Sequence, residues 1–92
     1  MVNSAIITVK EFSGYEIGDF ELPIKMPVED LSKKLVDVLK AIDSERYEGI
    51  SDIKIRYNNR ILQNNQTLYS QGIWDGSIIT ISREVQNTRN KK

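Results

Sequence analysis

The sequence predicts a single α+β domain in which one amphipathic helix packs across a mixed sheet. Two observations support this fold class. Apolar residues recur with helical spacing from Val28 to Ile42, and they alternate with polar residues in segments on both sides of that stretch. A chain of 92 residues can bury roughly 60 to 65% of its unfolded surface, which is enough for one core. We expect a short lead at 1–4, the domain at 5–83 and a disordered polar tail at 84–92.

Two strands joined by a loop are predicted to open the domain. Within 5–10, Ile7 and Val9 alternate with Thr8 and Lys10, which is typical of a strand with one buried face, although Ile6 breaks the pattern. The two glycines within 11–18 indicate a hairpin loop. The alternation resumes over 19–25. Pro23 has no amide hydrogen to donate, so we expect this second strand at an edge of the sheet.

The helix is the clearest predicted element because its apolar residues form one stripe. The stripe consists of Val28, Leu31, Leu35, Val38, Leu39 and Ile42. Burying six such side chains contributes on the order of 10 kcal/mol before chain entropy is counted, so the stripe should face the sheet. Pro27 prevents an earlier start, and Asp30 is the expected N-cap. Gly49 offers a stop, and whether 43–48 is helical or a turn is left open.

The second half of the chain supplies the remaining strands. Alternation over 53–57 predicts a third strand, and the asparagine pair at 58–59 suits a tight turn into a short strand at 60–62. Leu68 and Ile73 are isolated apolar residues in polar connections, and we expect them to close one end of the core.

The last predicted strand, at 77–82, helps to define a candidate contact surface. Its alternation directs Ile79 and Ile81 to one face and Ile78, Thr80 and Ser82 to the other. The outward residues belong to a basic and hydroxyl-bearing face, made of Thr8, Lys10, Lys54, Arg56, Thr80 and Ser82, with Arg60 nearby. The plain interpretation is a solvated face, because sheets of this kind commonly wet one side. The functional hypothesis is that this face docks an acidic surface of a partner or of another copy.

Trp74 is a separate candidate for partner binding. It precedes an Asp-Gly turn, where partial exposure is expected, and large exposed aromatic residues are enriched in binding hot spots. The ordinary alternative is a ring folded over Leu68 or over the end of the helix.

The composition argues against catalysis, metal binding and cofactors. The chain contains no cysteine and no histidine, which removes thiol chemistry, the usual general base near neutral pH and the commonest zinc ligand. The acidic residues of the helix and of 43–48 are expected to be solvated, and their spacing fits no calcium loop. The N-terminus lacks the pattern of a secretory signal, and no apolar run is long enough to insert in a membrane. We therefore predict a non-enzymatic cytosolic protein.

Charge is balanced over the whole chain but not along it. Thirteen Lys and Arg residues match thirteen Asp and Glu residues, so the net charge gives no argument for nucleic acid. Residues 1–52 carry six bases and eleven acids, a net −5, whereas residues 53–92 carry seven bases and two acids, a net +5. This asymmetry leaves a weak homodimer, paired head to tail, as an open alternative.

The order of the predicted elements is that of the β-grasp fold of ubiquitin-like proteins, and the likeness covers 5–83. Within that class the chain resembles the YukD/EsaB family, the small ubiquitin-like proteins of bacterial type VII secretion. Three segments carry the resemblance: the loop and strand from Phe12 to Pro23, the Pro27-Val28 pair, and Gln71 to Gly76 before the last strand. It implies an accessory protein of a Gram-positive bacterium whose partners are membrane-embedded secretion components.

The polar end of the sequence bears on the alternatives. Ubiquitin-like modifiers and sulfur carriers act through C-terminal glycines, but this sequence ends Asn90-Lys91-Lys92 and has no glycine after Gly76. We therefore rank a modifier or sulfur carrier below an accessory protein, and a scaffold domain of an unrelated complex is the third alternative. Arg56, Thr80 and Ser82 match the positions of the apolar patch of ubiquitin, so ubiquitin receptors are not expected to bind.

Overall fold

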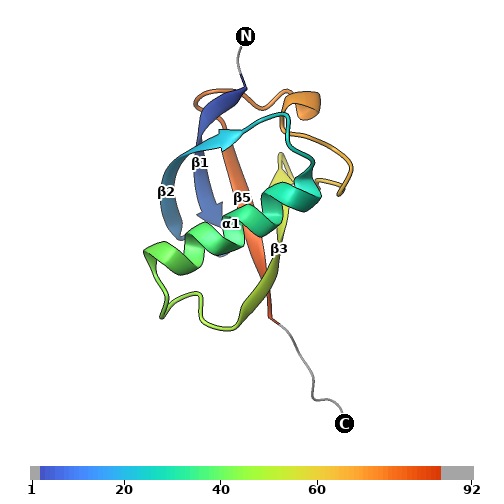
Figure 1. Ribbon diagram of the computed structural model, residues 1–92. Coiled ribbons are helices and arrows are strands. Elements are labelled where there is room, and N and C mark those ends of the chain that lie inside the picture. Colours follow the sequence, from blue (N-terminus) through green and yellow to red (C-terminus); the bar gives the residue numbers. More distant parts are fainter. Residues whose placement is uncertain (1–2, 86–92) are drawn as a thin grey trace.

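Residues 3–85 are described by a computed structural model, in which one helix crosses a five-stranded sheet (Figure 1). The predicted α+β fold class is confirmed. The elements are β1 (Ser4–Glu11), β2 (Glu16–Pro23), α1 (Val28–Ile42), β3 (Ile50–Tyr57), β4 (Arg60–Ile61), a 3-10 helix (Tyr69–Gln71) and β5 (Ile78–Val85).

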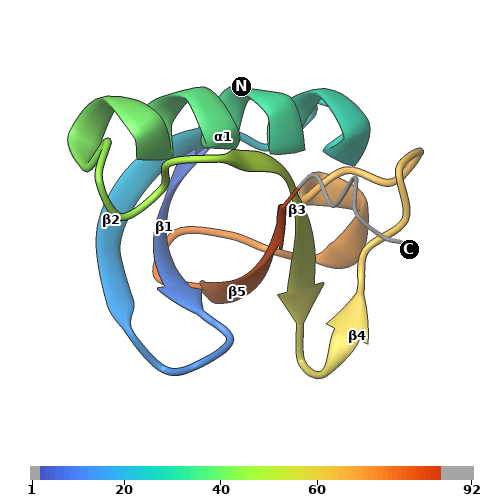
Figure 2. The ribbon, with the colours of Figure 1, turned by 90° about the horizontal axis from the view of Figure 1, so that it is seen from below.

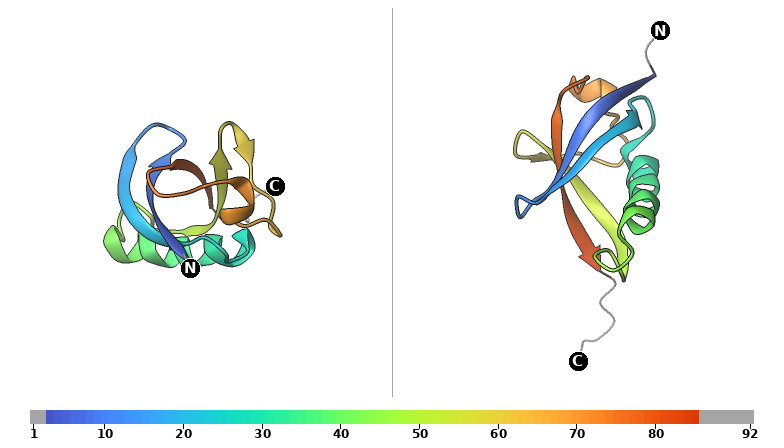
Figure 3. Two further views of the ribbon diagram at one scale, coloured as in Figure 1. Left: turned by 90° about the horizontal axis from the view of Figure 1, so that it is seen from above. Right: turned by 90° about the vertical axis from the view of Figure 1, so that its left-hand side faces the viewer.

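The sheet is mixed, and its strand order is β2-β1-β5-β3-β4. β1 runs parallel to β5, while the β1–β2, β3–β4 and β3–β5 pairs are antiparallel. β2 lies at an edge, as Pro23 predicted. α1 covers one face of the sheet (Figures 2 and 3), which leaves the other face open.

Most of the predicted helical stripe is buried against the sheet. Its fully buried members are Val28, Leu31, Leu35 and Leu39. Val38 is half-buried and Ile42 is 53% exposed, so the stripe ends sooner than its periodicity predicted. Ser32 and Val36 are also buried, because the face of the helix that packs on the core is wider than the predicted apolar stripe.

The start of α1 differs from the prediction of an Asp30 cap. The helix begins at Val28 after Pro27, and no side chain caps it. The amides of Val28 and Glu29 instead donate to the carbonyl oxygens of residues 66 and 64, at 2.7 and 3.1 Å. Because a distant connection satisfies these free helix-end amides, a side-chain cap is not needed there.

Several element boundaries also differ from the sequence prediction. β1 extends to Glu11 and β2 begins at Glu16, so the hairpin loop is shorter than expected and covers only 12–15. The region 43–48, left open by the sequence, is a series of turns, and the chain re-enters the sheet at Ile50. β5 continues to Val85, beyond the predicted end at Ser82, so the first two residues of the expected tail are strand; the rest of that tail, 86–92, lies outside the described residues.

The remaining turns behave as their residues predict. Asn58 and Asn59 both have positive φ, 52° and 67°, as a tight turn between antiparallel strands requires. Leu68 and Ile73 are fully buried and close one end of the core, as predicted. Asp75 accepts a 2.7 Å hydrogen bond from the amide of Ile6, which fixes the turn before β5 against the first strand.

Candidate functional site

The open sheet face carries most of the basic and hydroxyl residues predicted from the sequence. Strand register places Lys10 and Arg56 on either side of Thr80, and Lys54 next to Ser82. Thr8 lies on the same face, one alternation before Lys10 on β1. Residues in register across a sheet share a face, so β1, β5 and β3 jointly present these side chains.

An acidic border on β2 flanks this basic face and was not included in the predicted site. Glu16 is the register partner of Lys10, and Asp19 is the partner of Thr8. The Thr8 hydroxyl donates a 2.7 Å hydrogen bond to Asp19 Oδ1, so it is engaged within the molecule. The alternation on β2 had indicated that its charged residues face outward, but only the pairing with β1 shows which residues they adjoin.

Arg56 is the most constrained of the basic residues. Its guanidinium carbon lies 4.6 Å from the centroid of the Phe12 ring, at the start of the β1–β2 loop. The Phe12 amide donates to the Ile81 carbonyl oxygen at 2.8 Å, which holds this loop residue beside β5. Arg56 Nε and Ser82 Oγ are both buried, and neither has a hydrogen-bond partner within residues 3–85. Sequence reasoning did not include Phe12, because nothing in a glycine-containing loop shows which strand its aromatic residue will reach.

Arg60 and Trp74 lie apart from the strands that form the centre of the face. Arg60 is on β4 and donates to Gln71 Oε1 at 3.3 Å, next to the 3-10 helix. Trp74 is 48% exposed in the connection before β5. Its ring meets Tyr69 edge-on, with centroids 5.3 Å apart, and Lys25 Nζ lies 5.1 Å from the Tyr69 ring centroid. Trp74 is thus part of a second, aromatic surface feature.

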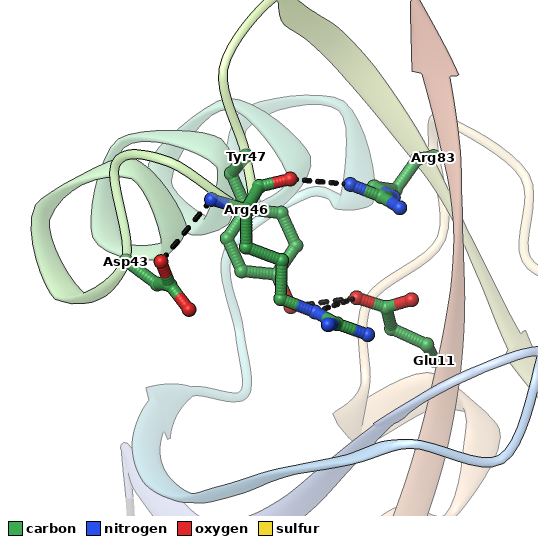
Figure 4. A network of polar contacts seen from close by, with 5 residues as sticks. All are labelled: Glu11, Asp43, Arg46, Tyr47 and Arg83. Carbon is green, nitrogen blue, oxygen red and sulfur yellow. Dashed lines mark hydrogen bonds and ion pairs between the residues drawn. The ribbon is translucent and has the colours of Figure 1, made fainter.

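A buried polar network, which the sequence did not predict, lies at the end of β1 (Figure 4). The Glu11 carboxylate is 6% exposed and accepts hydrogen bonds from Arg46 Nε at 3.0 Å and from the Tyr47 hydroxyl at 2.7 Å. Arg83 donates to the Arg46 carbonyl oxygen at 2.6 Å. The Arg46 guanidinium carbon also lies 3.6 Å from the Tyr15 ring centroid. The inward positions of the first strand alternate from Ile7 to Val9, and continuing this pattern by two residues would have placed Glu11 inside.

The network shifts the pKa values of its members. Burial alone would raise the pKa of Glu11, but the hydrogen bonds from Arg46 and Tyr47, together with the charge of Arg83, outweigh it and hold that pKa below its usual value. Burial, and to a smaller extent the hydrogen bond to Glu11, raises the pKa of Tyr47 to about 12. An ionised Glu11 and a neutral Tyr47 therefore form a stable pair at neutral pH, and the arrangement joins three chain segments.

Several kinds of site are not found among residues 3–85. They form no pocket and contain no group of three or more His, Cys, Asp or Glu side chains placed to hold a metal ion. No helix in this range has the length and apolar character needed to cross a bilayer.

Comparison with known families gives a match over most of the chain. Residues 6–81 match a family model described as "WXG100 protein secretion system (Wss), protein YukD". No curated protein sequence is significantly similar.

Solved structures with the same fold include ubiquitin-like domains of secretion proteins. The chain is 20% identical to the ubiquitin-like domain of the type VII secretion system protein ECCD1 from Mycobacterium tuberculosis, with a TM-score of 0.69 over 89% of this chain and 99% of that one. It is 15% identical to the EccD5 ubiquitin-like domain from Mycobacterium xenopi, with a TM-score of 0.70 over 94% of this chain and 100% of that one.

A larger assembly also contains this fold. A chain of the MycP5-free ESX-5 inner membrane complex is 19% identical, with a TM-score of 0.71 over 99% of this chain. The present chain spans only 23% of the length of that protein. These likenesses establish a ubiquitin-like β-grasp fold.

Proposed function

Because this chain belongs to the YukD family of the WXG100 protein secretion system, we propose that it is a non-enzymatic accessory or regulatory component of a bacterial type VII secretion system. It acts through protein–protein contacts, in the cytoplasm of a Gram-positive bacterium, and secretion partners recruit it to the membrane. The finding that carries this proposal is the family match over 6–81.

The open sheet face is the surface we assign to partner binding. Lys10, Lys54 and Arg56 bring three positive charges to adjoining strands, with the hydroxyl groups of Thr80 and Ser82 between them. Such a face attracts an acidic surface at long range and positions it by hydrogen bonds at short range. A sheet face without a covering helix is also open to solvent, so a partner can approach it.

The partner class is proposed to be the membrane-embedded secretion proteins. Support comes from the fold shared with the EccD ubiquitin-like domains and with a chain of the ESX-5 inner membrane complex. A small free-standing domain of this fold can occupy, or compete for, a position next to such domains. Self-association through the acidic border and the basic face would use the same charges.

Covalent modification is not part of the proposed role. No two glycines are adjacent among the 92 residues, whereas modifiers and sulfur carriers of this fold act through such a pair. The polar side chains that we assign to partner binding on the open face are hydroxyl and basic groups, and the sequence contains no histidine or cysteine to activate them, so they suit recognition rather than acyl transfer.

A deletion strain tests the secretion role. Removing the gene should impair export of small helical substrates, and the wild-type protein supplied from a plasmid should restore it. Intact-mass analysis of the protein recovered from that strain should show no adduct and no thiocarboxylate. Normal export in the deletion strain would refute the secretion role, and a mass corresponding to an adduct would favour the modifier alternative.

A further inference from the structure

Two buried hydrogen-bonding groups on the open face are left without partners, and they lie close together in the strand register. Ser82 is paired with Lys54, and Arg56 with the preceding outward residue of β5, Thr80, so Ser82 and Arg56 are diagonal neighbours. Arg56 Nε and Ser82 Oγ have no hydrogen-bond partner among residues 3–85. Buried polar atoms in folded proteins are paired as a rule, so a neighbouring pair of exceptions indicates a site that another molecule completes.

The Phe12 ring lies against one member of this pair, Arg56. The ring centroid is 4.6 Å from the Arg56 guanidinium carbon, and the Phe12 amide is bonded to the Ile81 carbonyl oxygen, one residue before Ser82. Figure 2 shows the β1–β2 loop and the β3–β4 turn on the side of the sheet away from α1, and β5 lies between β1 and β3. The Phe12 side chain is 64% exposed, and little packing opposes its rotation away from Arg56.

The chemistry of the two groups selects an anionic acceptor. Arg56 Nε can only donate, and the Ser82 hydroxyl can donate to the same atom. The guanidinium fork matches a carboxylate, and Lys10 and Lys54 on the flanking positions add positive charge. Among the side chains described for residues 3–83, the ion pair closer than 4.0 Å joins Glu11 to Arg46 and does not involve Arg56.

We propose that Arg56 and Ser82 form a carboxylate-binding site for one glutamate or aspartate side chain of a protein partner, and that Phe12 covers the site in the free protein. The proposal rests on the protein-binding role proposed for the open face, and it names the residues that anchor the partner. An acidic side chain displaces the Phe12 ring, accepts hydrogen bonds from Arg56 Nε and from the Ser82 hydroxyl, and leaves both buried donors satisfied.

The test is an NMR titration of the ¹⁵N-labelled full chain with a capped glutamate-rich peptide, and with the matched glutamine peptide as a control. The Arg56 side-chain Nε–H and the Ser82 amide should shift with the glutamate peptide alone. Ser82→Ala should weaken binding about fivefold, the effect of one net hydrogen bond. Phe12→Ala should tighten it about two- to fivefold, because the ring's cation–π contact with Arg56 no longer competes.

If the peptide bound through overall charge alone, the variants would give a different pattern of affinities. Lys34→Gln removes one positive charge from the exposed side of α1 and should leave the affinity unchanged, whereas Arg56→Gln should abolish the preference for glutamate. Equal losses in these two variants, or weaker binding in Phe12→Ala, would overturn the proposal. The amide spectrum of each variant verifies that it is folded.

The test of the carboxylate-binding site can fail independently of the test of the secretion role. If the peptide shifts neither Arg56 nor Ser82 while the deletion strain still loses export, the carboxylate site is refuted and the secretion role stands. If the peptide binds as expected while export is normal in the deletion strain, the site is real and the secretion role fails.

Discussion

Glu11 shows how a single buried charge can join distant parts of a small domain. Its carboxylate lies at the end of β1, while its two hydrogen-bond donors, Arg46 and Tyr47, come from the turns after α1. Arg83 on β5 adds a third segment by donating to the Arg46 carbonyl oxygen. An ion pair of this kind is sensitive to loss of one partner, because the charge that remains is buried and unpaired.

Acid should destabilise the protein through Glu11. Its pKa is lower in the folded state than the usual value of 4.5, so its contribution to stability is fully present above that pH and is lost as the pH falls through the folded pKa. Denaturant unfolding of Glu11→Gln at pH 7 should show a loss of about 1 to 3 kcal/mol, the range for a hydrogen bond to a charged group. The gap between variant and wild type should narrow well below pH 4.5.

Glu29→Gln is the matched control, because Glu29 is exposed in the first turn of α1. Its stability at pH 7 should stay within about 0.5 kcal/mol of the wild type. A pH-independent difference between Glu11→Gln and the wild type would contradict this account of the carboxylate.

Tyr47 should resist ionisation in strong base. Its pKa of about 12 lies above the ordinary value of 10.0, so the neutral folded form is favoured and stability declines as the pH rises from about 10 to 12. Absorbance titration should show a tyrosine transition near pH 12 that belongs to Tyr47. Tyr47→Phe should remove the late transition and lower the free energy of unfolding by about 1 to 2 kcal/mol at pH 7.

The helix shows, at the scale of an element, what periodicity can and cannot determine. The stripe from Val28 to Leu39 was placed correctly, because a 3.6-residue period in apolar residues reflects burial on one side. The same pattern included Ile42, which is 53% exposed. A period records which side of a helix is apolar, but the tertiary fold decides how far along the helix the sheet continues to cover it.

Two members of the predicted stripe should therefore respond differently to truncation. Leu35 is fully buried, so Leu35→Ala should cost about 2 to 5 kcal/mol, whereas Ile42→Ala should cost less than about 1 kcal/mol. Thermal or urea unfolding of both variants measures the difference. Equal losses would contradict this account, because they would mean that Ile42 is packed as tightly as Leu35.

The strands and the site were predictable to different degrees. The alternation of β1, β3 and β5 separated Ile53, Ile55, Ile79 and Ile81 from the outward residues, and all four are buried. The cover that Phe12 forms over Arg56, and the partners of Glu11, depend on loop paths and on contacts between segments far apart in the chain. A local sequence pattern carries no information about those contacts. The sequence could therefore assign residues to the open face, but it could not show that Phe12 packs against Arg56.

At the scale of the whole molecule, the sequence asymmetry in charge becomes a pattern across one face. The acidic β2 border and the basic residues of β1 and β3 lie on the same open side, so they are neighbours rather than opposite poles. Recognition therefore depends on where a partner contacts this face. An acidic partner must approach over β5 and β3 to avoid repulsion from the acidic residues of β2. The predicted division into charged halves thus survives on this face as a gradient from acidic β2 to basic β3, while Glu29, Asp30 and Asp37 lie on α1, over the other face.

Capture of partners should depend on the basic residues of the open face. Charge reversal at Lys54 and Arg56 together should reduce capture of membrane-embedded partners from detergent-solubilised cells by about tenfold or more at low salt. The deficit should shrink as salt is raised, because wild-type binding is then screened as well. Reversal of Lys33 and Lys34 on α1 is the control and should have little effect. Unchanged capture by the first variant would remove the open face from consideration.

The central position of β5 has a consequence for how the protein is made. β5 is the last described element in the chain, yet it separates β1 from β3 in the sheet, and the first amides of α1 are bound by carbonyl groups of residues 64 and 66. A nascent chain therefore lacks the partners of the first α1 amides until residues 64 and 66 have emerged, and it lacks a continuous sheet until β5 has emerged. We expect no stable domain to form before β5 has emerged, and products that stop short of β5 to be cleared by proteases.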